Sequence, residues 1–252
     1  MKKITKYIPN TLTCISLIFG FYAAILGITG NYFGAMCAIF TASLFDFLDG
    51  FAARMLHAYS PMGKELDSLS DVISFGVAPG MMLFSFLDNL LHSLSWNDSI
   101  LCKSLLLTAF AIPVFSALRL AKFNIDERQK TSFIGLPVPA NAIFWSALIT
   151  AFSADVHASY CIYPLLTELL TAIRPEIMLF ILSITAIISS LLLVSEIKLF
   201  SLKMTSLSLK ANKYVYILFA STILFVAFFG ILGVAAVILF YILLGVSSQH
   251  TN

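Results

Sequence analysis

Residues 46–71 read DFLDGFAARMLHAYSPMGKELDSLSD, a polar stretch set between two strongly apolar segments. It combines carboxylates, one arginine and two glycines, namely Asp46, Asp49, Asp67, Asp71, Arg54, Gly50 and Gly63. A carboxylate within hydrocarbon costs about 2.5–3.5 kcal/mol at a helix centre on insertion scales. Four aspartates in 26 residues therefore need a partner that offsets this cost, and a divalent cation is the natural one.

The rest of the chain has the composition of a membrane protein. Of its 252 residues, 60% are hydrophobic and 11% are charged, whereas soluble domains average about 45–50% apolar and 25% charged residues. A membrane-spanning helix needs roughly 20 mostly apolar residues. Such runs occur at 8–29, 33–57, 67–91, 99–121, 135–154, 176–196, 213–230 and 231–247. We therefore expect an all-α fold, a polytopic membrane helical bundle of about eight transmembrane helices.

The distribution of basic residues predicts how the bundle is oriented. The first run is longer than the 7–15-residue apolar region of a typical signal peptide and lacks a convincing cleavage site, so we interpret it as a retained helix. With the N-terminus inside, thirteen of the fifteen Lys and Arg residues fall on the cytoplasmic side, and Lys103 and Arg174 fall outside. The positive-inside rule thus predicts an integral membrane protein, which would lie in the inner membrane if the source is a bacterium, with the N-terminus and residues 46–71 facing the cytoplasm.

The spacing of the aspartates indicates a metal site. Asp46 and Asp49 are three residues apart and Asp67 and Asp71 are four apart, so each pair lies on one face of a helix. The segment 55–66 contains Ser-Pro and Gly and is short enough to bring the two helices together. Oxygen ligands without His or Cys favour hard cations, so we predict Mg²⁺ or Mn²⁺, and four carboxylates can bridge two ions.

A pair of metal ions flanked by carboxylates is a common arrangement for moving a phosphoryl group. Gly50 removes a side chain where a phosphate needs close backbone approach, and Arg54 can bind a phosphate through two hydrogen bonds. Each of these residues alone is equally typical of a helix cap or a packing contact. Their concentration in one hairpin favours a site.

These residues also carry a family resemblance. Asp46, Asp49-Gly50, Ala53-Arg54, Gly63, Asp67 and Asp71 reproduce every fixed position of D-x2-D-G-x2-A-R-x8-G-x3-D-x3-D. The chain therefore resembles the CDP-alcohol phosphotransferase family. The resemblance implies transfer of a phosphoalcohol group from a CDP-activated donor to a hydroxyl acceptor, with release of CMP. It also implies a six-helix membrane core and a homodimer.

The resemblance assigns a role to each matching residue. It implies that Asp46, Asp49, Asp67 and Asp71 bind two divalent cations, and that Asp71 is also the catalytic base. It implies that Gly50, Ala53, Arg54 and Gly63 hold the CDP moiety.

Segments that flank the signature point to the acceptor. They are IPNTLT at 8–13, SDVISFGVAP at 70–79, ALRLAKFN at 117–124 and FIGLPVPA at 133–140. These segments are similar to phosphatidylserine synthases of the membrane-embedded type, which implies CDP-diacylglycerol and L-serine as substrates and no nucleic-acid partner. The similarity is best over 8–150. We expect a catalytic core at 1–196, followed by a cytoplasmic loop and two C-terminal helices at 197–252.

The acceptor site is predicted from fewer residues. Serine has a carboxylate that needs a cation, and Arg119, with Asn124 and Ser74 nearby, is the candidate. Arg119 and Lys122 are equally typical of juxtamembrane anchors. Two alternatives stay open at this point. One is another acceptor, glycerol 3-phosphate, and the other is a divalent-cation transporter, because intramembrane carboxylates also line ion pathways.

Overall fold

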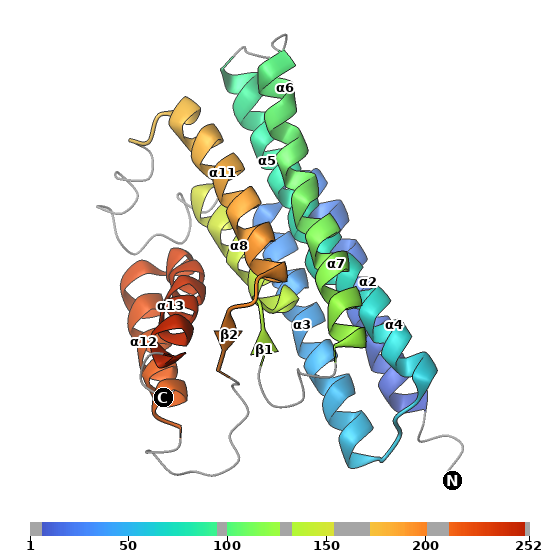
Figure 1. Cartoon of the computed structure of the whole chain (residues 1–252). Coiled ribbons are helices and arrows are strands. Elements are labelled where there is room, and N and C mark those ends of the chain that lie inside the picture. The colour runs from blue at the N-terminus through green and yellow to red at the C-terminus, as the bar shows by residue number, and fades with distance from the viewer. Residues whose placement is uncertain (1–6, 95–99, 127–132, 154–171, 201–211, 250–252) are drawn as a thin grey trace.

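The chain forms a bundle of long helices (Figure 1). The computed structural model describes residues 7–94, 100–126, 133–153, 172–200 and 212–249. The helices are α2 (Tyr7–Ile28), α3 (Tyr32–Met55), α4 (Pro61–Asp71), the π-helical η1 (Val72–Val77), α5 (Ala78–Ser93), α6 (Ile100–Leu106), the 3₁₀ turn η2 (Leu107–Phe110), α7 (Ala111–Ile125), α8 (Val138–Phe152), α11 (Pro175–Val194), α12 (Lys213–Phe229) and α13 (Ile231–Gln249). The predicted all-α membrane bundle is confirmed.

The apolar helical segments overlap the eight predicted runs. Five are long and apolar enough to cross a membrane: Tyr7–Ile28, Tyr32–Met55, Pro61–Ser93, Lys103–Ile125 and Pro175–Val194. Three shorter apolar helices are Val138–Phe152, Lys213–Phe229 and Ile231–Ser247. The protein is therefore an integral membrane protein. The loop predicted near 197–212 lies largely outside the described residues.

Helix α2 packs closely against both helices of the 46–71 hairpin. The Ser16 hydroxyl donates to the Ala42 carbonyl of α3 at 2.9 Å, and the Ser74 hydroxyl of η1 donates to the Ser16 carbonyl at 3.2 Å. A side chain at Gly20 would overlap Ser74, so glycine permits this approach. Small residues and interhelical hydroxyl bonds are the usual means of helix association in lipid.

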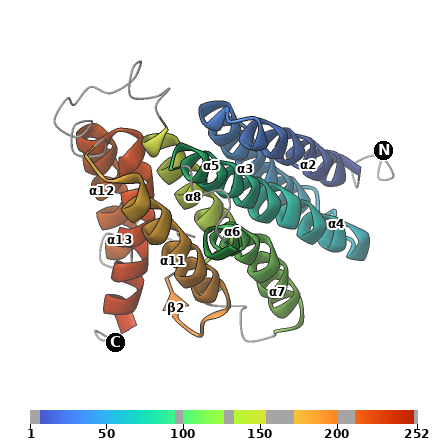
Figure 2. The same cartoon turned by 90° about the horizontal axis from the view of Figure 1, so that it is seen from above.

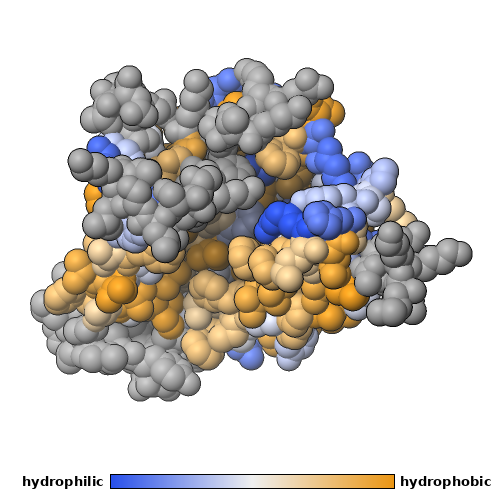
Figure 3. All heavy atoms as spheres, turned by 90° about the horizontal axis from the view of Figure 1, so that it is seen from below, coloured by the Kyte–Doolittle hydropathy of each residue, from blue (hydrophilic) through white to orange (hydrophobic). Residues whose placement is uncertain are grey.

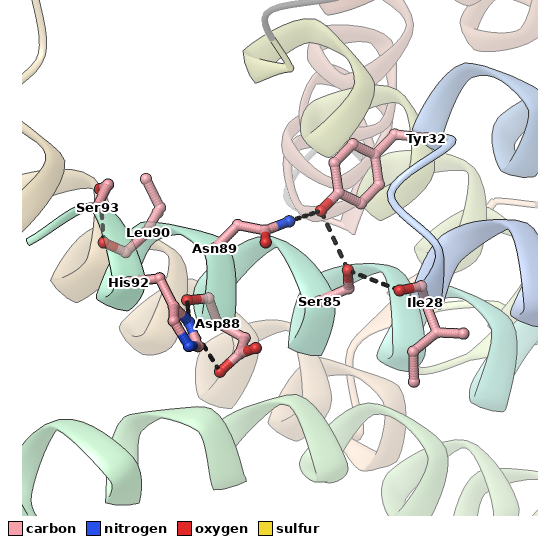
Figure 4. Close-up of polar contacts among 8 residues, drawn as sticks. All are labelled: Ile28, Tyr32, Ser85, Asp88, Asn89, Leu90, His92 and Ser93. Carbon is pink, nitrogen blue, oxygen red and sulfur yellow. Dashed lines mark hydrogen bonds and ion pairs between the residues drawn. The ribbon is translucent and has the colours of Figure 1, made fainter. Parts of the chain in front are cut away.

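A polar network fixes the opposite end of the α2–α3 pair (Figure 4). The Asn89 amide donates to the Tyr32 hydroxyl at 2.9 Å, and that hydroxyl lies 3.3 Å from Ser85 Oγ. Ser85 in turn donates to the Ile28 carbonyl at 3.3 Å. These bonds hold the α2–α3 turn against α5. They do not involve the other end of α3, which carries Asp46 and Asp49.

The C-terminal helices form a separate side of the bundle. Figure 2 shows α12 and α13 beside α8 and α11, away from α2 and α4. Helix α13 packs along α8, and α8 is joined to α11 by a 3.0 Å hydrogen bond from Trp145 Nε1 to Ser189 Oγ. Trp145 is fully buried and is among the largest side chains of the core.

Two short strands were not expected from the sequence. β1 (Phe133–Ile134) and β2 (Lys198–Leu199) pair antiparallel, with Phe133 opposite Leu199. They join the segment before α8 to the segment after α11. Residues 198–199 were predicted to lie in a cytoplasmic loop, and 133–134 lie between two predicted apolar runs.

The third apolar run begins earlier than predicted, at Pro61 instead of residue 67. The Ser60 hydroxyl caps α4 by accepting from the Gly63 N–H at 3.0 Å, and Pro61 occupies the first turn. Both are ordinary helix-start signals, which hydropathy overlooks. The aspartates of α4 are therefore held on a regular, capped helix.

Candidate active site

The aspartates of α3 and α4 meet across the hairpin. Asp46, Asp49 and Asp67 each offer a carboxylate oxygen, and these oxygens all lie within 4.8 Å of one another. Asp71 lines the same cavity as these three residues, so the fourth carboxylate joins the group. Like charges this close repel strongly in a low-dielectric setting. The arrangement is one that a bound cation would stabilise.

Asp49 is oriented by a residue from a third helix. Its side chain is buried, and the Thr13 hydroxyl of α2 donates to Asp49 Oδ2 at 2.6 Å. Ser70, between Asp67 and Asp71 in sequence, donates to the Thr13 carbonyl at 3.3 Å. Helix α2 therefore fixes the position of both carboxylate-bearing helices.

The acidic cluster opens into a cavity of about 620 Å³. Its wall includes all four aspartates and Phe47, Gly50, Arg54, Lys64, Ser68, Arg119, Leu120, Phe123, Asn124, Pro137 and Pro139. This volume falls within the about 300–1,000 Å³ of typical ligand pockets. Figure 3 views the molecule from below and shows a patch of hydrophilic residues bordered by hydrophobic surface. The cavity wall itself combines charged side chains with apolar ones, such as Phe47, Leu120 and Phe123.

Arg119 and Asp71 carry buried polar atoms that lack partners. Arg119 is only 7% exposed, and its guanidinium carbon lies 5.0 Å from the centre of the Phe123 ring. Within the part of the chain that the structure describes, Arg119 Nε and Nη2 and Asp71 Oδ1 have no hydrogen-bond partner. An unsatisfied buried polar group costs about 1–3 kcal/mol. Such atoms on the wall of a cavity indicate a polar ligand or a cation.

A smaller cavity of about 190 Å³ adjoins the larger one. Both are lined by Asp49, Gly50, Lys64 and Asp67, and the smaller is also lined by residues from the start of α2. A Cβ at Gly50 would lie 3.5 Å from Arg54 Nη1 and meet nothing else within 4 Å. The space over Gly50 is therefore open to a ligand.

The structure brings most of the predicted site residues together. Gly50, Arg54, Arg119 and Asn124 line the larger cavity with the four aspartates, and Ala53 and Gly63 line the smaller one. Ser74 is different. It is fully buried, donates to the Ser16 carbonyl, and is absent from both walls, so we do not retain it in the acceptor site.

Asn124 also forms hydrogen bonds that connect α7 to α4. Its side-chain amide donates to Ser68 Oγ at 2.9 Å, and its backbone carbonyl accepts from Lys64 Nζ at 3.1 Å. These two bonds hold the end of α7 against α4 at the cavity wall.

Sequence reasoning missed several wall residues. Asn10, Thr13 and Phe123 were noted only as parts of segments that carry the resemblance, and Ser68 was given no role. Lys64, Asp67 and Asp71 recur at helical spacing, which is the signal that could have placed Lys64 on the same face.

The sequence profile of the CDP-alcohol phosphatidyltransferase family matches residues 6–247. The chain belongs to this family. It is 41% identical over 134 residues to the CDP-diacylglycerol–serine O-phosphatidyltransferase of Bacillus subtilis, an alignment that covers 53% of the chain and 70% of that relative. It is 33% identical over 191 residues to the protein of the same name in Methanocaldococcus jannaschii, covering 76% and 72%. It is 34% identical over 167 residues to the archaetidylserine synthase of Methanothermobacter thermautotrophicus, covering 63% and 66%.

Members of this family generally depend on divalent metal ions, and the carboxylate cluster is compatible with such a site. The cluster supplies oxygen donors alone, and Asp71 adds a buried oxygen without a partner among the described residues. The residues present therefore fit a hard divalent cation.

Proposed function

We propose that the chain transfers the phosphatidyl group of CDP-diacylglycerol to L-serine, giving phosphatidylserine and CMP. The observation that carries this proposal is the convergence of four carboxylates and Arg119 on one cavity. The names of the three relatives all contain serine, whereas one of them names a different lipid. The acceptor is therefore supported more strongly than the lipid tail of the donor.

The donor diphosphate would be held at the acidic cluster. Asp46, Asp49, Asp67 and Asp71 would bind two divalent cations, Mg²⁺ or Mn²⁺. When bound, the cations neutralise phosphate oxygens and stabilise the attacking and leaving oxygens. Gly50, Ala53, Arg54 and Gly63 would hold the CDP moiety. The open space over Gly50 and the exposed guanidinium of Arg54 support this assignment.

The acceptor would lie between Asp71 and Arg119. Arg119 binds the serine carboxylate through two parallel hydrogen bonds, which uses the two nitrogens that lack partners in the described residues. Asn124, on the same wall, would help to position the serine. The serine hydroxyl is then directed toward the diphosphate, and Asp71 takes its proton. A bond forms between the serine oxygen and the phosphatidyl phosphorus. The bond to the CMP oxygen breaks, and CMP leaves with the electron pair.

Three further assignments belong to this proposal. The active site and the N-terminus face the cytoplasm, which the basic residues support under the positive-inside rule. The protein is a homodimer, as the family resemblance implies. Residues 1–196 form the catalytic core, and 197–252 add a cytoplasmic loop and two helices.

Purified protein tests the proposal directly. It is incubated with CDP-diacylglycerol, Mn²⁺ or Mg²⁺, and serine, ethanolamine or glycerol 3-phosphate in turn, and lipid products and CMP are measured. We expect phosphatidylserine with serine only, and none from Asp46→Asn. A lipid product formed with glycerol 3-phosphate and not with serine would show that glycerol 3-phosphate is the acceptor. Metal uptake into proteoliposomes without lipid turnover would favour a transporter.

A further inference from the structure

A separate, apolar cavity lies among α8, α12 and α13. Its volume is about 380 Å³, and it is lined by Pro137, Pro139, Ala140, Ile143, Leu218, Phe219, Thr222, Val237, Ile238 and Tyr241. The two hydroxyls on this wall already have acceptors. Thr222 donates to the Leu218 carbonyl at 2.7 Å, and Tyr241 donates to the Phe200 carbonyl at 3.1 Å. Little on the wall remains to bind a polar group, so the cavity suits hydrocarbon.

This apolar cavity borders the acidic one. Pro137 and Pro139, at the start of α8, line both cavities. A ligand with a charged head and an apolar tail could therefore occupy both cavities at once.

The apolar cavity also communicates with the outside of the bundle. Phe219 lines it and is 59% exposed on an apolar helix of the membrane domain. A lipid can therefore reach the cavity from the bilayer with its chain still in hydrocarbon surroundings.

Resting on the proposed function, we propose that the cavity among α8, α12 and α13 holds one acyl chain of the lipid donor while the diphosphate lies at the acidic cluster. Each buried methylene is worth about fourfold in affinity, so even a partly buried chain selects the donor strongly. The proposal gives α12 and α13, which lie outside the predicted six-helix core, a role in donor binding.

Filling the cavity tests the proposal. Thr222→Trp places a large side chain on its wall, and Ile223→Trp is the matched control because Ile223 is the next residue of α12 and is 72% exposed. We expect Thr222→Trp to raise the KM for a long-chain donor at least about tenfold, the effect of losing about two buried methylenes. The KM for a short-chain donor and the KM for serine should not move, and Ile223→Trp should match wild type. Equal effects on long and short donors, or no effect, would overturn the proposal.

A binding measurement separates this proposal from the proposed function. CDP-diacylglycerol with a diazirine on one acyl chain is photocrosslinked to the wild-type protein, and labelled residues are mapped by mass spectrometry. We expect labels at Leu218, Val237 and Ile238, removed by excess unlabelled CDP-diacylglycerol but not by phosphatidylcholine. Equal competition by phosphatidylcholine would assign the cavity to bilayer lipid and overturn the proposal. Labelling does not require turnover, so labelled protein that makes no phosphatidylserine would refute the function alone. Turnover with labels elsewhere would refute the acyl-chain site alone.

Discussion

Arg119 is the residue whose burial most clearly indicates a ligand. Its guanidinium is buried against Phe123, and two of its nitrogens bond to nothing within the described residues. A juxtamembrane anchor would instead extend its charge toward water or lipid headgroups. Burial beside Asp71, on the wall of the acidic cavity, therefore favours acceptor binding over anchoring.

Arg119→Lys keeps the charge of this residue and removes its forked geometry. We expect the KM for serine to rise roughly 10- to 150-fold, because a hydrogen bond between charged groups is worth about 1.5–3 kcal/mol. Steady-state kinetics at saturating donor measures the effect, and the donor KM is the internal control. Ethanolamine lacks the carboxylate, so use of ethanolamine as readily as serine would remove Arg119 from the acceptor site.

Gly50 allows a test of the proposed binding site for the CDP moiety. A methyl group at this helical position meets no atom closer than 3.5 Å, so Gly50→Ala should fold normally and gain about 0.5–1 kcal/mol of stability. The methyl group would occupy space proposed for the CDP moiety, and we expect the donor KM to rise about tenfold or more. Unfolding and kinetics are measured on the same preparation. A more stable variant with an unchanged donor KM would contradict the assignment.

The turn between α3 and α4 sets the geometry of the site at the scale of elements. Helix α3 ends in a Schellman motif, because the Ala58 N–H donates to the Ala53 carbonyl at 3.0 Å and the His57 N–H donates to the Arg54 carbonyl at 3.3 Å. His57 has φ +48°, the one positive φ of a non-glycine residue in the described segments. This position normally favours glycine.

His57→Gly should therefore stabilise the protein by about 1 kcal/mol, because the left-handed conformation costs about 1–2 kcal/mol for a residue with a Cβ. His57→Val should be destabilising. Tyr59→Gly, in the same turn with an ordinary φ, is the matched control and should not stabilise. The unfolding midpoint in detergent is the measurement. A loss of stability in His57→Gly equal to that of Tyr59→Gly would show that the strain is absent.

The helices themselves were largely predictable from the sequence. Hydropathy located all eight apolar segments, because a helix in lipid needs a long uninterrupted apolar run. It missed the first six residues of α4, because the helix start is set by Ser60 and Pro61 and these residues are not strongly apolar. It also missed the β1–β2 pairing, which joins two-residue segments far apart in the chain and has no local pattern.

The candidate site was predictable only where its residues lie close to one another in the sequence. The pairs Asp46–Asp49 and Asp67–Asp71 follow from helical spacing, and their convergence was expected from the short hairpin between them. Thr13 reaches Asp49 from α2 across 36 positions, which no local pattern encodes. Ser74 was expected near Arg119 in the acceptor site, but it lies in the π-helical η1 and donates to the Ser16 carbonyl of α2.

At the scale of the whole molecule, the proposed function requires like charges to lie close together within an apolar bundle. Apolar helices converge on four carboxylates whose mutual repulsion destabilises the folded protein when no cation is present. Functional sites are where such departures from optimal packing and charge are expected. The repulsion among the four carboxylates therefore predicts how the stability of the protein responds to a divalent cation.

We expect Mg²⁺ or Mn²⁺ to raise the thermal unfolding midpoint of the wild-type protein and EDTA to lower it. Binding at a hundredfold excess over Kd adds about 2.7 kcal/mol, or roughly 5–10 °C. Asp67→Asn removes one of the repelling charges and one ligand together, so its midpoint in EDTA should exceed that of wild type while its response to metal is largely lost. Asp88→Asn, on α5 outside the cavity, is the control and should respond like wild type. If Asp67→Asn were less stable than wild type in EDTA and still gained the full shift, the acidic cluster would be stabilised by the fold alone and would not be the metal site.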